Sequence, residues 1–62
     1  MKTIKINVYR SGGEWFGARW IGGEYDGCDA LDASTEEEAL EEARTMPLAT
    51  QGEREINRVA DA

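Results

Sequence analysis

The sequence predicts a small α+β domain, in which an antiparallel sheet of three to four strands carries one acidic helix in the order β-β-(β)-α-β. Three observations predict this class. Segment 3–10 alternates apolar and polar residues with the period of two that is typical of a half-buried strand. Segment 14–21 is rich in aromatic and other strand-forming residues. Segment 34–46 starts with a helix cap and continues with apolar residues at helical spacing. A meander with the helix packed across it is the simplest two-layer arrangement for this order.

The first strand has the most regular pattern. Its apolar side chains Ile4, Ile6 and Val8 fall on one face. Ser-Gly-Gly at 11–13 follows, and glycine tolerates the positive φ angles that tight hairpin turns require. The second strand, 14–21, is therefore expected to run antiparallel to the first.

The second strand places its two tryptophans, Trp15 and Trp20, on opposite faces. One of them is expected in the core and the other at least partly exposed, where tryptophan is a frequent contact residue of interfaces. Gly-Gly at 22–23 predicts another turn. Segment 24–33 then forms either a third strand or an extended loop, because its aspartates and glycine are poor strand formers.

The helix is predicted from its start and its stop. Two capping boxes overlap at its N-terminus, Ser34 with Glu37 and Thr35 with Glu38, and either would satisfy free backbone N–H groups of the first turn. Pro47 is expected to end the helix about one residue earlier in the chain, because a proline disfavours helical backbone angles in the residue before it. The apolar stripe of this helix consists of Ala39, Leu40, Ala43 and Met46.

The tail, 53–60, is predicted to be a last strand, although Ile56 and Val59 are three residues apart, which also suits one helical turn. No repeat or linker interrupts the order of elements. The sequence therefore predicts one domain over residues 1–62.

Composition limits what can stabilise this domain. A chain of 62 residues is near the lower limit for a core without disulfides or metal. It has one cysteine, Cys28, and no histidine, so neither an intrachain disulfide nor a structural zinc site is expected. No apolar run approaches the roughly 20 residues that cross a bilayer, and the N-terminus lacks the apolar stretch of a signal peptide. We therefore expect a protein of the bacterial cytoplasm, without metal, cofactor or membrane contact.

Charge is unevenly distributed. Seven basic and 13 acidic residues give a net charge of −6, which argues against direct binding to a nucleic-acid backbone. Segment 24–42 has nine carboxylates and no basic residue. Such a segment is most simply a solvated face that keeps the protein soluble. The alternative is a surface that meets a basic partner or mimics DNA.

Catalysis is not expected. General acid–base and nucleophilic mechanisms most often use histidine, which this chain lacks. Cys28 is most simply a small strand residue, and the carboxylates have little room for a water-excluded pocket in so small a domain. The sequence predicts no catalytic residue, and it indicates a protein that acts by binding another macromolecule.

Segments 33–43 and 55–59 resemble the small phage proteins that inhibit host bacterial RNA polymerase. The resemblance implies a wedge that docks through arginines of its last strand against an acidic jaw of the polymerase. Its acidic helix face would then lie toward the DNA channel and the sigma factor. Arg58 matches the first of these arginines. The matching acidic strip consists of Glu37, Glu38 and Glu41.

Two positions depart from that pattern. Ala60 stands where the phage inhibitors have a second arginine, and Arg44 stands where they have another acid. A second resemblance is to the antitoxin domain of HicB-like pairs, in which a hairpin leads to Gly-Cys and then to Thr-x-Glu-Glu-Ala-Leu. Residues 27–28 and 35–40 are similar to that pattern with one extra residue between them, and no DNA-binding module follows.

The leading hypothesis is a phage-type inhibitor for host takeover, which blocks a host nucleic-acid enzyme. The leading candidate for this enzyme is RNA polymerase. The second is a CRISPR effector, which would make the chain an anti-CRISPR protein. The alternatives are an antitoxin that neutralises a small basic ribonuclease, and a subunit that assembles through a sheet edge. The protein is expected to be a monomer or weak dimer. The predicted partner-binding residues are Glu37, Glu38, Glu41, Arg58, Asp29, Asp32 and Trp15.

Overall fold

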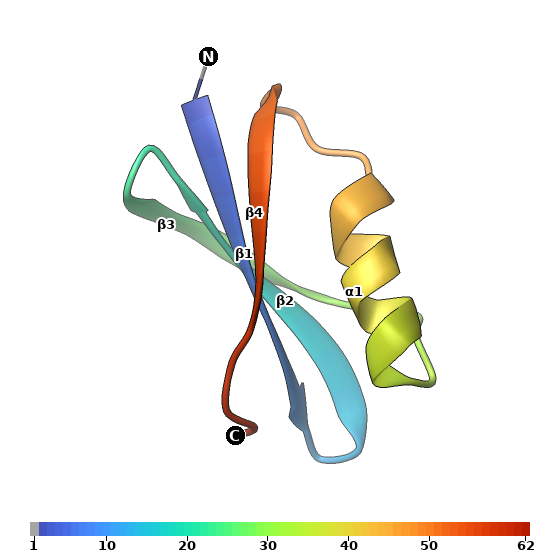
Figure 1. Ribbon diagram of the computed structural model, residues 1–62. Coiled ribbons are helices and arrows are strands. Elements are labelled where there is room, and N and C mark those ends of the chain that lie inside the picture. Colours follow the sequence, from blue (N-terminus) through green and yellow to red (C-terminus); the bar gives the residue numbers. More distant parts are fainter. Residues whose placement is uncertain (1) are drawn as a thin grey trace.

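The computed structural model describes residues 2–62 as four strands and one helix (Figure 1). The chain forms β1 (Lys2–Ser11), β2 (Glu14–Ile21) and β3 (Glu24–Ala30), then α1 (Glu36–Thr45) and β4 (Gly52–Arg58). The predicted α+β class and the order of elements are confirmed. The segment after the second turn is a strand rather than a loop, and the tail is a strand rather than a helical turn.

The sheet has the strand order β3-β2-β1-β4. The pairs β1–β2 and β2–β3 are antiparallel, whereas β4 joins β1 in parallel. The sheet is therefore mixed, and the expectation of an antiparallel meander is wrong for its last strand. The reason is the connection between β3 and β4. Helix α1 carries the chain back over the sheet, so that β4 starts at the same end of the sheet as β3 and runs parallel to β1. Parallel strands need a crossover of about the length of a helix.

Two-residue glycine turns determine the register of the three antiparallel strands. Gly12 and Gly13 have φ angles of 59° and 82°, the left-handed values of the tight hairpin turn that matches strand twist. Ser11 thus pairs with Glu14, and one step further Arg10 lies opposite Trp15. Because opposite residues of neighbouring strands share a face, Trp15 lies on the same side of the sheet as the even-numbered residues of β1.

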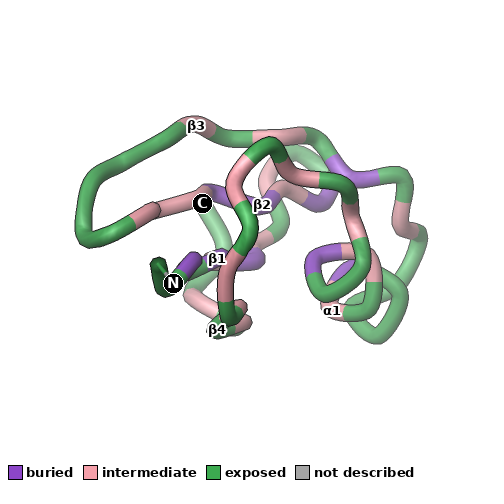
Figure 2. Tube along the Cα trace, turned by 90° about the horizontal axis from the view of Figure 1, so that it is seen from above, coloured by how far each residue is buried: buried purple, intermediate pink, exposed green. Residues whose placement is uncertain are grey.

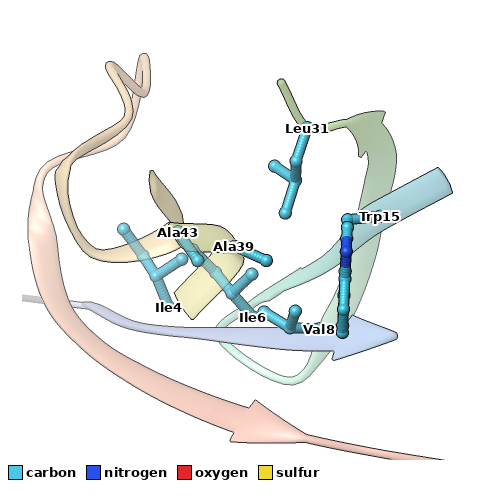
Figure 3. Packing of buried hydrophobic residues seen from close by; sticks show 7 residues of the cluster. All are labelled: Ile4, Ile6, Val8, Trp15, Leu31, Ala39 and Ala43. Carbon is cyan, nitrogen blue, oxygen red and sulfur yellow. The ribbon is translucent and has the colours of Figure 1, made fainter. Parts of the chain in front are cut away.

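The core lies between this face of the sheet and α1 (Figure 3). Ile4, Ile6 and Val8 are fully buried beneath the helix. The helix contributes Ala39 and Ala43, whose small side chains allow its backbone to lie close to β1. The remaining buried residues of this cluster are Trp15 and Leu31.

The opposite face of the sheet has no covering layer in the described part of the chain, because α1 lies on one side only (Figures 1 and 2). We call it the open face. Its aromatic side chains come from three adjacent strands and are Tyr9, Phe16, Trp20 and Tyr25.

Candidate partner-binding site

The N-terminus of α1 uses one of the two predicted capping boxes. Thr35 is the N-cap residue, and its Oγ1 accepts a hydrogen bond of 3.2 Å from the backbone N–H of Glu38. The carboxylate of Glu38 accepts in turn from the backbone N–H of Ser34 at 2.9 Å. Glu38, one of the predicted partner-binding residues, is therefore tied to the helix cap, while its negative charge stays at the surface.

The solvent side of α1 carries Glu37 and Glu41, which are one helical turn apart. Glu41 is 3.4 Å from Arg44, but both side chains are more than half exposed, so water screens this pair. Within residues 2–62, the carboxylate of Glu37 has no hydrogen bond or ion pair. In the connection before the helix, Asp32 is exposed, and its backbone N–H donates to Glu42 at 2.9 Å. Asp32, Glu37 and Glu41 form what we call the acidic surface.

Asp29, another predicted partner-binding residue, lies in an ion-pair cluster at the edge of the sheet. The guanidinium of Arg19 donates to the carboxylate of Asp29. Its Nε also lies 3.3 Å from Oδ2 of Asp26. The register of β2 and β3 shifts at Asp26, which is the extra residue of a β-bulge, and the neighbouring Gly27 has a φ of 130°. Asp29 is therefore largely neutralised by the protein itself.

Arg58 is also held within the protein. Its guanidinium lies 2.8 Å from Glu36 and 2.9 Å from Asp61, and it covers the ring of Trp15 at 4.9 Å. The hydrogen bond to Asp61, and next that to Glu36, raise the pKa of Arg58. The backbone N–H of Arg10 and then Arg58 itself hold the pKa of Asp61 below its usual value. Glu36, Asp61 and Trp15 thus all contact Arg58, the arginine that the polymerase-inhibitor resemblance assigns to docking.

Trp15 requires a correction. It was predicted to contact a partner, but it is only 6% exposed and belongs to the core. The guanidinium groups of Arg58 and Arg10 lie 4.9 and 5.8 Å from the centre of its ring. The register of the first hairpin is the reason, because it turns Trp15 toward the helix and Trp20 toward the open face.

The nine carboxylates of segment 24–42 remain largely uncompensated. Only three arginines, Arg19, Arg44 and Arg58, pair with carboxylates of this segment, so nine negative charges face three positive ones and six are left in excess. This number equals the net charge of the whole chain. Among residues 2–62, no three side chains of the metal-binding types come together to hold an ion. The arrangement is thus suited to electrostatic attraction of a basic surface.

The open face holds aromatic residues that the predicted set of partner-binding residues did not include. Tyr9 stacks on Phe16 with ring centres 5.6 Å apart, and Trp20 meets Tyr25 edge-on at 5.2 Å. Tyr25 is 61% exposed. The hydroxyl of Tyr9 lies 3.3 Å from the sulfur of the exposed Cys28, a contact that raises the pKa of Tyr9. The sequence signal for this surface was the second strand, in which apolar residues occur on both faces.

The single helix of the described residues is neither long nor apolar enough to cross a membrane. Comparison with protein-family models, with curated proteins and with solved structures finds no match. The function is therefore argued from the surface of the protein.

Proposed function

We propose that this protein is a non-catalytic antitoxin of the HicB-like type, which binds and neutralises a small basic ribonuclease through the acidic surface of Asp32, Glu37 and Glu41. The observation that carries the proposal is the uncompensated negative charge of segment 24–42, most of whose exposed carboxylates lie on α1 or just before it. A high net negative charge steers a protein toward a basic partner and raises the rate of association.

A ribonuclease is a suitable partner because it must bind a phosphate backbone with basic residues. A rigid surface that carries carboxylates competes with RNA for the same cations. The inhibitor needs no catalytic group for this action, since occupying the RNA-binding surface of the enzyme is sufficient.

Two observations favour the antitoxin over the polymerase inhibitor. The polymerase resemblance requires a free arginine on the last strand, whereas Arg58 is paired with Glu36 and Asp61 and covers Trp15. The residues of the antitoxin-like pattern have defined structural roles, because Gly27 adjoins the bulge of β3 and Thr35 caps α1.

The proposal predicts that a small basic ribonuclease is encoded beside this protein, and its absence would contradict the antitoxin assignment. Inhibition of that ribonuclease is measured as RNA cleavage, and its affinity by calorimetry. The double variant Glu37→Lys/Glu41→Lys removes the acidic surface of the helix. We expect its affinity to fall by at least about tenfold, because it replaces attraction to a basic partner with repulsion. The matched control is Glu14→Lys/Glu53→Lys, which changes the net charge equally at exposed positions away from α1.

Two outcomes contradict a role for the acidic surface: both double variants still inhibit the ribonuclease, or both lose inhibition to the same extent. If the ribonuclease is not inhibited and an RNA polymerase or a CRISPR effector is, the partner is that enzyme and the antitoxin assignment is wrong.

A further inference from the structure

The central strand β2 has the composition of a strand that is covered on both faces. Trp15, Gly17, Arg19 and Ile21 face the helix side, while Phe16, Ala18 and Trp20 follow Glu14 on the other side. A sheet that presents one face to water normally alternates apolar and polar residues. On β2 the open face carries no polar residue between its aromatic ones, so a second layer over this face is missing from the single chain.

The small size of the protein indicates what supplies that layer. In domains below about 70 residues a single core supplies little stability, and many such domains add disulfides, a metal or oligomerisation. Among the described residues, the fully buried large side chains are limited to Ile4, Ile6 and Val8, and one cysteine without any histidine allows neither an intrachain disulfide nor a zinc site. Association of two copies would enlarge the core without either of these.

The pairing of the strands places four open-face residues in one row across the sheet. Trp20 pairs with Tyr25 on one side and with Lys5 on the other, and Lys5 pairs with Glu55. The row therefore reads Tyr25, Trp20, Lys5, Glu55 from β3 to β4. None of the ion pairs within residues 2–62 involves Lys5.

We propose that two copies of this chain pack open face to open face, related by a two-fold axis that runs parallel to the strands. This axis reverses the row, so Trp20 lies over Lys5 of the second copy and Tyr25 lies over its Glu55. An ammonium group over an indole and a phenol donating to a carboxylate are both favourable contacts. Self-complementarity of this kind is what a two-fold interface requires.

The surface shape supports the same arrangement. A hollow of about 450 Å³ lies on the open face, lined by Lys5, Trp20 and the turn at Gly22–Gly23 among others. In the proposed dimer, Trp20 of the second copy lies over Lys5 and so reaches this hollow.

A second row gives further pairing. Phe16 and Tyr9 are cross-strand partners near the other end of the sheet, so the same axis places each over the other residue of the second copy. The strands of two packed sheets cross at about 30°. This angle shifts the outer strands of one copy relative to those of the other more than it shifts the central strands. An axis perpendicular to the strands would instead place Glu55 over Glu55, and like charges oppose that arrangement.

The occupant is not a nucleic acid, although aromatic residues on sheets do stack on bases in several RNA-binding domains. Those surfaces combine aromatic rings with several cations. Here Lys5 shares the open face with Glu53 and Glu55, while the acidic surface lies beyond the helix. That separation also keeps most of the negative charge of the two copies away from the proposed interface.

The test is sedimentation equilibrium of the purified chain from the order of 1 µM to 1 mM, with acrylamide quenching of tryptophan fluorescence at the same concentrations. We expect a monomer–dimer equilibrium, with Trp20 shielded as the dimer forms and Trp15 shielded throughout. Tyr25→Ser and Lys5→Glu should each raise the dimer dissociation constant by about tenfold or more. Tyr25 is exposed in the single chain, so its replacement leaves the core intact, which circular dichroism checks.

The control is Glu41→Ser, which changes an exposed residue of the acidic surface and should leave the dissociation constant within about twofold of wild type. A chain that stays monomeric over the whole range overturns the proposal. A dimer that neither Tyr25→Ser nor Lys5→Glu weakens also overturns it, because the copies then meet elsewhere. The result does not depend on the ribonuclease, so this inference and the antitoxin proposal are tested separately.

Discussion

At the scale of single residues, the cluster around Trp15 determines what the C-terminal residues do. Arg58 covers the indole, and Asp61 joins Arg58 to the backbone N–H of Arg10 at the end of β1. The backbone N–H of Ala62 also donates to the carbonyl of Arg10. Hydrogen bonds therefore hold the residues after β4 against β1, the strand that contributes Ile4, Ile6 and Val8 to the core.

Asp61 should make the stability of the protein depend on acid pH. Its pKa is lowered in the folded state, so its contribution is present above the unfolded pKa, 3.8, and is lost as the pH falls through the folded value. We expect Asp61→Asn to be less stable than wild type at neutral pH. The difference in the free energy of unfolding between the variant and wild type should shrink as the pH falls through the pKa of Asp61 in the folded state.

Urea denaturation in steps from neutral to about pH 2 measures this effect. Glu53→Gln is the control, because this exposed carboxylate has no ion pair within residues 2–62. A difference between Asp61→Asn and wild type that stays constant over the whole pH range would contradict the role of the Asp61 carboxylate.

At the scale of elements, α1 and its cap hold both layers of the domain together. The helix buries only two alanines against the sheet, Ala39 and Ala43. Most of its other residues are charged, and three glutamates of its first turn lie where the helix dipole is positive. The helix therefore relies on its cap and on this charge arrangement more than a helix with a broad apolar face would.

Thr35→Ala should destabilise the protein by about 1 kcal/mol, because it removes the hydrogen bond to the N–H of Glu38. Ser34→Ala is the matched control, since Ser34 contributes its backbone N–H rather than its hydroxyl. We expect it to change stability by less than about 0.5 kcal/mol. Chemical denaturation compares the two, and equal losses would mean that the caps are interchangeable.

At the scale of the whole molecule, the net charge of −6 acts on the fold and on binding in opposite directions. Within the chain, unpaired carboxylates repel one another and destabilise the compact state. Between the chain and a basic partner, the same carboxylates attract. Dissolved salt screens both effects over about 8 Å at physiological ionic strength.

Added salt should therefore stabilise the isolated protein and weaken its complex. We expect the melting temperature of the free chain to rise between about 20 and 300 mM NaCl, while the dissociation constant for the basic partner increases. The Glu37→Lys/Glu41→Lys variant should respond less in both measurements. Affinity that is independent of salt would show that apolar contacts, not the acidic surface, determine binding.

Much of the fold was predictable because its signals are local. The alternation of Ile4, Ile6 and Val8 indicates a strand with one buried face, and the capping residues before α1 indicate where a helix starts. Even the burial of Trp15 was within reach, since a two-residue turn at Gly12–Gly13 places this residue on the face of Val8.

The candidate site was less predictable because it depends on contacts between distant residues. Asp29 and Arg58 looked like free surface charges, yet Arg19 pairs with the first, and Glu36 and Asp61 pair with the second. No local pattern reports such pairs.

The sequence by itself determined the class of the domain, its order of elements, its acidic segment and the turn glycines, because each of these depends on neighbours along the chain. The tertiary structure alone decided that β4 joins β1 in parallel, that Arg58 is held over Trp15, and that the aromatic residues of three strands gather on one uncovered face. These features depend on which strands become neighbours in space. The path of α1 over the sheet decides the first two, and the register of the paired strands decides the third.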